Sequence, residues 1–192
     1  MALFRTVDET LPNIVGRGVT LRVPQSGDFD EWAQVREQSR AFLTPWEPTW
    51  PADDLTRSAF RRRLKRYTED LRADLAYAFL IFRSDDNAMV GGLTLANIRR
   101  GVAQAGAIGY WIGEPFARQG YMTAAMRALV PFCFGTLRLH RLEAACIPTN
   151  AASIGLLEKT GFQREGYARA YLCINGLWQD HLLYARLKDD RD

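Results

Sequence analysis

The sequence predicts an α/β fold of the α+β kind: one mixed, mostly antiparallel sheet of about seven strands, with four helices on its faces. Apolar residues at helical spacing mark the first third of the chain, and short strand-like runs separated by turn residues mark most of the rest. The predicted order of elements is β-α-α-β-β-β-α-β-α-β-β. With 192 residues and no internal repeat, the chain is expected to form a single domain over 1–192.

Composition and cysteine content narrow the class of protein. Apolar residues make up 47% and charged residues 24%, as in soluble globular proteins, and a net charge of +3 is too small to indicate nucleic-acid binding by itself. The three cysteines lack metal-ligand spacing, so we expect reduced, buried thiols and no metal site. Residues 1–13 lack the apolar core of a signal peptide, and no run of about 18 apolar residues occurs. These observations predict a cytoplasmic protein that does not cross a membrane.

The first part of the chain is predicted to hold a short strand and a helix. Residues 19–23 alternate as a strand that Pro24 ends, and Asp28 is placed to cap the helix that follows. Residues 40–50 are rich in aromatic side chains, and the prolines in and beside this stretch keep it out of a regular helix.

A second helix is predicted to follow, capped by Asp53 or Asp54 and ending at Arg72. Apolar side chains lie on one side of it, and the other side is strongly basic. A face of this kind is usually exposed to solvent without a partner. Its basic residues are Arg57, Arg61, Arg62, Arg63, Lys65 and Arg66.

From residue 76 the pattern changes to strands joined by turns. Two further helices are predicted, at about 120–135, where Pro131 is expected to cause a bend, and at 150–160, where Gly161 follows the end. Asn175-Gly176 is the best hairpin signal in the chain. The predicted strands are 77–83, 89–98, 103–113, 142–147, 162–174 and 178–187.

The turn at 114–125 follows a strand and opens a helix. Gly120 lets the backbone approach a ligand closely, and the first N–H groups of the helix lack intrahelical partners. With the helix dipole these groups form an anion site, to which Arg118 adds charge. Read alone, the same residues fit an ordinary strand-to-helix turn equally well.

The strand that ends at Gly113 makes the ligand more specific. If this strand splays from the next one, its free N–H and C=O groups can pair with a ligand that contains amides. Pantetheine has two amides, and its pyrophosphate would then reach the helix N-terminus, which suits coenzyme A. Asn150 and Ser153, near the start of the later helix, could reach a ligand between the splayed strands. The expected cofactor-binding residues are Trp111, Ile112, Gly113, Arg118, Gln119, Gly120, Tyr121, Met122, Thr123, Asn150 and Ser153.

These two motifs resemble motifs A and B of the GNAT acetyltransferase superfamily, in the same order and at a similar separation. Five stretches are similar to the RimJ/RimL-type ribosomal-protein N-acetyltransferases: 40–48, 140–141, 156–162, 165–168 and 171–181. The resemblance covers roughly 17–187. It implies the GNAT fold with a sheet splayed in its middle, and acetyl-CoA as co-substrate. It also implies direct transfer of acetyl to the N-terminal α-amine, with alanine first, of a small-subunit ribosomal protein.

Some positions depart from these families. Ala117 stands where the phosphate loop usually has Arg or Gln, and Leu157 stands where many members have a tyrosine acid. Ala170 replaces an acidic residue frequent in the RimJ/RimL type, so the base proposed for those enzymes is not carried over. An α-amine with a pKa near 8 needs a weaker base than lysine near 10.4, by about 3 kcal/mol at pH 7. An alanine at position 170 therefore fits an N-terminal α-amine as acceptor better than it fits a lysine side chain.

The candidate catalytic residues are Glu47, as base directly or through water, and Ser153, as hydrogen-bond donor to the leaving thiolate. The alternative role of Glu47 is that of a surface residue that orders its proline-flanked loop through a hydrogen bond. Glu143 is a second candidate base, and a half-buried ion pair with Arg141 is its alternative role. Asp180 and His181 are adjacent on one strand and should face opposite sides. The expected acceptor-site residues are Trp46, Glu47, Tyr171 and Asp180, although Trp46 could anchor a loop and Tyr171 could be a core aromatic.

Two other functions fit the same sequence. One is acetylation of a small amine such as an antibiotic, a polyamine or an amino acid, because a fold does not determine its substrate. The other is a non-catalytic acetyl-CoA-binding or ribosome-assembly protein, suggested by Ala170 and Leu157. The expected partner is a ribosomal protein N-terminus or a ribosomal particle, with weak rRNA contact through Arg57–Arg66 as the alternative to a solvated face. The expected oligomeric state is monomer or homodimer.

Overall fold

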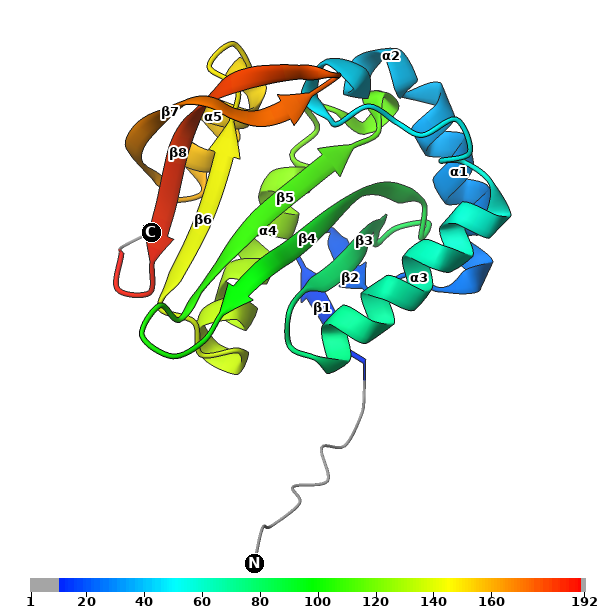
Figure 1. Cartoon of the computed structure of the whole chain (residues 1–192). Coiled ribbons are helices and arrows are strands. Elements are labelled where there is room, and N and C mark those ends of the chain that lie inside the picture. Colours follow the sequence, from blue (N-terminus) through cyan, green and yellow to red (C-terminus); the bar gives the residue numbers. More distant parts are fainter. Residues whose placement is uncertain (1–10, 191–192) are drawn as a thin grey trace, which may run out of the picture.

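The computed structural model of the chain describes residues 11–190. Most of the N-terminal segment interpreted above as unlike a signal peptide lies outside the described residues. The described part contains one open sheet with the strand order β1-β2-β3-β4-β5-β6-β8-β7 (Figure 1). Its strands are β1 (Asn13–Gly16), β2 (Val19–Arg22), β3 (Tyr77–Arg83), β4 (Met89–Arg99), β5 (Ala105–Ile112), β6 (Arg141–Cys146), β7 (Gln163–Ile174) and β8 (Leu177–Leu187).

The pairing of these strands confirms the predicted mixed, mostly antiparallel sheet. Strands β5 and β6 are parallel, and the other neighbouring pairs are antiparallel. The described residues form eight strands rather than about seven. The additional strand, β1, has only four residues, and its sequence Asn-Ile-Val-Gly is too short for alternation to stand out. It pairs with β2 through a tight hairpin in which Gly18 has a positive φ.

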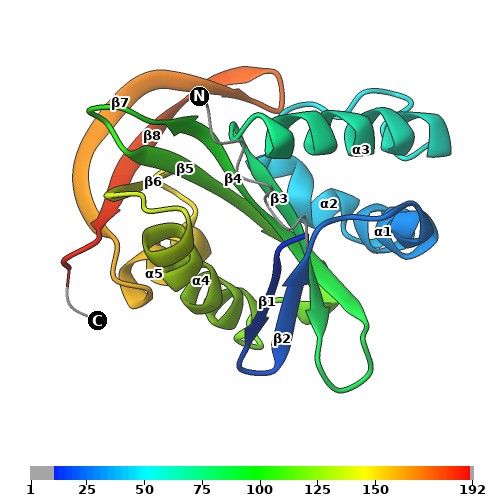
Figure 2. The same cartoon turned by 90° about the horizontal axis from the view of Figure 1, so that it is seen from below.

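Helices cover both faces of the sheet. Figure 2 shows α4 and α5 on one face and α1, α2 and α3 on the other. The described residues contain five α-helices where four were predicted, and the additional one, α2, is a single turn in the stretch expected to be irregular. It ends at Leu43, and the chain continues directly as a 3-10 turn, Thr44–Trp46, that contains Pro45. The helices are α1 (Phe29–Gln38), α2 (Arg40–Leu43), α3 (Arg57–Arg72), α4 (Tyr121–Pro131) and α5 (Ala151–Lys159).

The start of α3 differs from the prediction. Thr56 caps this helix, because its hydroxyl accepts a hydrogen bond from the Ala59 N–H at 3.2 Å. The prediction that Asp53 or Asp54 is the cap is therefore wrong. Both carboxylates lie one turn earlier in the chain and accept hydrogen bonds from arginines of the helix instead, Asp53 from Arg62 at 2.5 Å and Asp54 from Arg63 at 2.6 Å.

Two local predictions in the second half are confirmed. The regular part of α4 ends at Pro131, and the chain continues as a wider π-helical turn, Phe132–Thr136. Asn175 and Gly176 have φ values of 46° and 78°, the left-handed conformation that a two-residue hairpin turn needs, and they join β7 to β8.

The sheet opens between β5 and β6, as the predicted splay requires. The two strands pair only at Ala105–Arg141, Gly106–Leu142 and Ala107–Glu143. Beyond these pairs β5 continues against β4 as far as Ile112, and β6 continues against β8 as far as Cys146. Figure 1 shows the two strands separating toward one end of the sheet. The edge of β5 that faces the gap therefore has no strand partner over its last residues.

Candidate functional site

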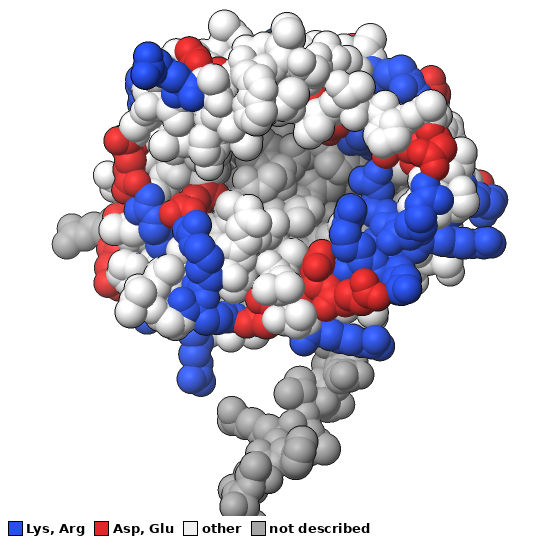
Figure 3. All heavy atoms as spheres, in the orientation of Figure 1, with Lys and Arg blue, Asp and Glu red and all other residues white. Residues whose placement is uncertain are grey.

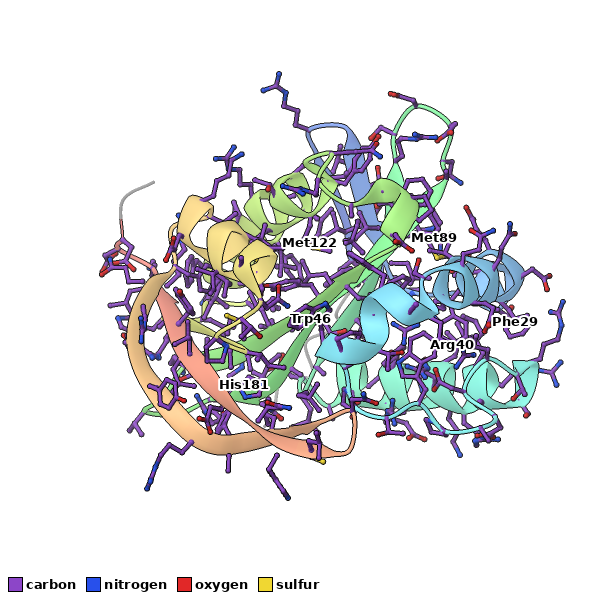
Figure 4. All side chains as sticks on the ribbon, turned by 90° about the horizontal axis from the view of Figure 1, so that it is seen from above. Phe29, Arg40, Trp46, Met89, Met122 and His181 are labelled. Atoms are coloured by element: carbon purple, nitrogen blue, oxygen red, sulfur yellow. The ribbon has the colours of Figure 1, made fainter. Side chains whose placement is uncertain are left out.

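The turn before α4 has the geometry of an anion site. Gly120 is the N-cap residue, with φ = 88°, a conformation that side chains of L-residues rarely adopt. No side chain caps the helix, so the N–H groups of Tyr121, Met122 and Thr123 are not satisfied by a cap. Arg118 also has a positive φ and is exposed beside them. The Met122 side chain is buried under α4 (Figure 4), so this residue can contribute only its backbone.

A groove of about 650 Å³ adjoins this turn, between α4 and the β1–β2 hairpin. It is lined by Gln119, Gly120, Tyr121 and Thr123, together with three exposed basic residues, Arg17, Arg127 and Lys159. None of these three forms an ion pair with another residue in 11–190. These three residues were not among those predicted from the sequence, because they come from a hairpin and two helices that are far apart in the chain.

The three β5-end residues expected to hold the cofactor have different roles. The Gly113 N–H donates to the Val90 carbonyl at 2.8 Å, so it is already paired with β4. Because N–H directions alternate along a strand, Trp111 also directs its N–H toward β4, and Ile112 directs its N–H toward the gap. Ile112 is thus the donor best placed to polarise a carbonyl lying in the gap.

A pair of hydroxyls links β5 to α5 across the gap. The Tyr110 and Ser153 hydroxyl oxygens lie 2.5 Å apart, and either can be the donor. Asn150 caps α5, as predicted, by accepting a hydrogen bond from the Ser153 N–H at 3.0 Å. Burial raises the pKa of Tyr110, so its phenol stays protonated at neutral pH. The sequence analysis named Ser153 but not Tyr110, whose partner lies 43 positions later.

A second cavity, of about 360 Å³, lies on the opposite face of the sheet, under α1, α3 and the loop at 47–51. Its floor includes Thr94 and Gly109 of β4 and β5, and its walls are rich in aromatic residues. Figure 3 shows this face of the molecule hollowed near its centre, with Lys and Arg side chains gathered on the side of α3. Two carboxylates, Glu47 and Asp54, are among the residues that line it.

Glu47 does line this cavity, and its carboxylate accepts three hydrogen bonds. Its two oxygens accept hydrogen bonds from the Arg36 guanidinium at 2.8 Å each, and one of them also accepts from the Trp50 indole N–H at 2.7 Å. Its backbone carbonyl accepts from the Asn175 N–H at 2.9 Å. These contacts agree with the alternative in which Glu47 orders its loop, and its assignment as base stays a prediction.

Glu143 forms the ion pair that was its alternative role. It accepts hydrogen bonds from Arg99 at 2.6 Å and from Arg141 at 3.0 Å. Burial acts to raise the pKa of Glu143, but the two arginines outweigh it and hold the pKa below its ordinary value. Arg141 also pairs with Glu165, on β7. Glu143 is therefore part of a charged cluster on the sheet and does not line either cavity.

The remaining acceptor-site candidates do not line the cavity under α1 and α3. Asp180 accepts hydrogen bonds from the Tyr167 hydroxyl and from the Ala170 N–H, which holds the irregular stretch of β7 where Ala170 has a positive φ. His181 faces the other way, is 3% exposed, and packs its ring 5.7 Å from that of Tyr171. Trp46 is 37% exposed, and in the view of Figure 4 it lies nearer the middle of the molecule than Arg40.

Neither a metal site nor a membrane-spanning helix is found in residues 11–190. No group of three or more His, Cys, Asp or Glu side chains in this part of the chain is arranged to hold a metal ion. No helix of this part is long and apolar enough to cross a membrane.

Known proteins are similar to this chain in sequence and in fold. The acetyltransferase (GNAT) domain family matches residues 19–163. The protein named probable N-acetyltransferase YjcK from Bacillus subtilis (strain 168) is 35% identical over 175 residues, 91% of this chain and 97% of YjcK. The ribosomal protein uS5-alanine N-acetyltransferase of Escherichia coli (strain K12) is 34% identical over 165 residues, 85% of each chain. The structure of Mycobacterium smegmatis RimJ in complex with CoA-disulfide superposes with a TM-score of 0.86 at 29% identity, covering 93% of this chain and 87% of that one.

Proposed function

This chain belongs to the GNAT acetyltransferase family and is an acetyl-CoA-dependent N-acetyltransferase, and we propose that its acceptor is the N-terminal α-amine of a ribosomal protein, with alanine first. One observation carries the choice of amine. Both carboxylates that line the acceptor-side cavity are paired with arginines, Glu47 with Arg36 and Asp54 with Arg63. Neither carboxylate therefore faces the acceptor without a cationic partner of its own. An α-amine suits such a cavity better than a lysine side chain, whose pKa is roughly 2.5 units higher.

The cofactor is proposed to bridge the two faces through the gap between β5 and β6. Its pyrophosphate would accept hydrogen bonds from the N–H groups at 121–123, and its adenosine and 3′-phosphate would lie in the groove with Arg17, Arg127 and Lys159. The pantetheine amides would pair with the free edge of β5. This path brings the thioester to the gap, beside Ile112 and the Tyr110–Ser153 pair.

In the proposed reaction the neutral α-amine attacks the thioester carbonyl carbon directly in the ternary complex. The Ile112 N–H stabilises the oxyanion, and the carbon–sulfur bond then breaks to release the thiolate of coenzyme A. Ser153 donates a hydrogen bond to this thiolate, while the Tyr110 hydroxyl holds Ser153 in place. The proton of the amine passes to water. Glu47 already accepts three hydrogen bonds, from Arg36 and Trp50.

A ribosomal acceptor also suggests where the protein works and what it touches. The E. coli relative is named for ribosomal protein uS5, so the proposed partner is a ribosomal protein or particle in the cytoplasm. Several basic residues of α3 are already paired with carboxylates, Arg57 with Asp30 and Arg62 with Asp53 among them. We therefore propose only a weak contribution of α3 to rRNA binding.

Acetylation of a small amine is the second candidate, because a cavity of about 360 Å³ would also hold a free amino acid. The test is incubation with acetyl-CoA and either peptides that begin with Ala, Ser or Met or a panel of free amines, read by thiol release and mass spectrometry. Acetylation of the Ala-starting peptides at the α-amine is expected. Turnover of small amines with no acetylpeptide would overturn the proposal. Binding of acetyl-CoA without turnover of any acceptor would favour a non-catalytic role.

A further inference from the structure

Arg36 is a buried cation beside the acceptor cavity. This α1 residue is only 6% exposed, and its guanidinium lies 4.1 Å from the centre of the Trp50 ring and 4.9 Å from that of Trp111. A planar guanidinium can stack on an aromatic ring while its N–H groups bond in plane, which an ammonium group cannot do. A charge buried this deeply needs a counter-charge, because desolvation is otherwise unfavourable.

Glu47 provides that counter-charge in a fork-to-fork arrangement. Both terminal nitrogens of Arg36 donate to its carboxylate at 2.8 Å, and Trp50 adds a third bond at 2.7 Å. The Arg36 Nε has no hydrogen-bond partner among the described residues, so the pair is the main polar support of this guanidinium. Three donors from two residues thus fix the position of this carboxylate, as a structural role requires.

The pair joins four parts of the molecule. Arg36 belongs to α1, Glu47 and Trp50 to the loop over the cavity, and Trp111 to the end of β5 along which the cofactor is proposed to lie. The indole of Trp111 lies so close to β4 that a Cβ added at Gly92 would fall 2.4 Å from its Nε1. The Glu47 carbonyl accepts the Asn175 N–H at the tip of the β7–β8 hairpin. The loop is thus fastened to the cofactor strand on one side and to the hairpin on the other.

We propose that Arg36 and Glu47 are positioning residues for the acceptor amine, and that Glu47 is not the general base. The pair holds the 47–50 loop as one wall of the cavity, at a constant distance from the end of β5. The acceptor is then aligned with the thioester by the shape of the cavity. This inference rests on the proposed function for the identity of the acceptor but not for the role of the pair.

Conservative variants separate positioning from proton transfer. Arg36→Lys keeps the charge but loses the fork and the stacking, and Glu47→Gln keeps the size and one acceptor oxygen but loses the charge and the second acceptor. Under positioning, Arg36→Lys raises the acceptor KM about tenfold, roughly the loss of one charge-assisted hydrogen bond. The same variant leaves the KM for acetyl-CoA within about twofold of the wild-type value. Under the same role, Glu47→Gln lowers kcat by less than about tenfold, whereas losing a general base lowers it by roughly 100-fold or more.

The matched control is the Arg22–Asp28 pair. It is also a bidentate pair, with bonds of 2.8 and 2.6 Å, its arginine stacks 4.0 Å from the centre of the Phe82 ring, and its carboxylate accepts a third bond from the Gln25 N–H. It contacts neither the 47–50 loop nor the hairpin tip. Arg22→Lys should therefore lower stability by an amount similar to Arg36→Lys and leave the acceptor KM near that of wild type.

The experiment compares wild type, Arg36→Lys, Glu47→Gln and Arg22→Lys. It measures steady-state constants with the acceptor that wild type turns over, the pH profile of kcat/KM, and amide hydrogen exchange at 47–50 and 174–177. Positioning predicts an unchanged pH profile in Glu47→Gln, and faster exchange of both segments in Arg36→Lys and Glu47→Gln but not in Arg22→Lys. A kcat loss of about 100-fold in Glu47→Gln, with near-normal constants in Arg36→Lys, would overturn the positioning role, as would equal acceptor KM values in Arg36→Lys and Arg22→Lys.

If wild type acetylates no peptide but turns over a small amine, the proposed function fails. The same comparison on that amine, with the exchange data, still decides the role of the pair.

Discussion

Replacing Tyr110 by phenylalanine and Ser153 by alanine, singly and together, is expected to separate what their hydrogen bond does for folding from what it does for turnover. The two hydroxyl oxygens are 2.5 Å apart, and Ser153 is buried. Each single variant leaves one enclosed hydroxyl without its partner, which costs about 1–3 kcal/mol of stability. The double variant leaves neither, so it should lose about 1 kcal/mol less than the sum of the two single variants.

Turnover should respond differently from stability. The leaving thiolate has a pKa near 8.5 and needs only modest help, but a hydrogen bond to a charged group contributes about 1.5–3 kcal/mol. Ser153→Ala should therefore lower kcat by roughly 10- to 100-fold. Tyr110→Phe should lower kcat by less than about threefold, because Ser153 can still donate. Burial keeps the Tyr110 phenol protonated, so its loss should leave the shape of the pH profile between 6 and 9 unchanged.

Two measurements decide this prediction. Urea unfolding gives the stability of the four proteins, and thiol release at saturating acetyl-CoA gives kcat for a common acceptor. A wild-type kcat in Ser153→Ala would refute the role of this hydroxyl at the thiolate. Strictly additive stability losses would refute the reasoning that the two groups satisfy each other.

Three further outcomes are expected. Gly120→Ala should lower the unfolding free energy by about 1–2 kcal/mol, since φ = 88° is unfavourable for alanine, and should weaken coenzyme A binding in calorimetry; unchanged values for both would contradict the anion site. Neutralising Arg17, Arg127 and Lys159 should weaken coenzyme A binding more at low salt than at high salt, whereas equal loss at all salt concentrations would argue against the groove. The pKa of Glu143 and of Glu165 is lowered in the fold, so their contribution to stability is present above their ordinary value of 4.5 and is lost as pH falls below it. The stability gap between wild type and Glu143→Gln in urea should then be larger at pH 7 than at pH 4.

Much of the fold could be predicted from the local pattern of apolar and turn-forming residues in the sequence. The bounds of β3, Tyr77–Arg83, match the predicted strand, because a buried apolar run between turn residues carries its own signal. The β7–β8 turn at Asn175-Gly176 and the positive φ at Gly120 follow from the backbone preferences of those residues. Two elements, β1 and α2, were not predicted, because each has only four residues, too few for a periodic pattern. The cap of α3 was predicted wrongly, because several polar residues that could cap a helix stand close together before it.

The candidate site was predicted unevenly for a physical reason. Backbone sites such as the turn before α4 depend on neighbours in sequence, so glycine and strand-to-helix order were sufficient to indicate them. The role of a charged side chain depends on what burial places beside it. Glu47 is paired with Arg36, 11 positions earlier, and Glu143 is paired with Arg99, 44 positions earlier, and neither pairing can be read from the local sequence.

By itself, the sequence determined the sheet class, the helix N-terminus that suits a phosphate, and the superfamily to which the motifs point. Only the tertiary structure decided that Ile112 rather than Gly113 directs its N–H into the gap, that Tyr110 meets Ser153, and that three distant cations share one groove. The reason is that backbone conformation follows from nearby residues. Which donors remain free, and which charges become neutralised, depends instead on packing between elements that the chain brings together over long separations.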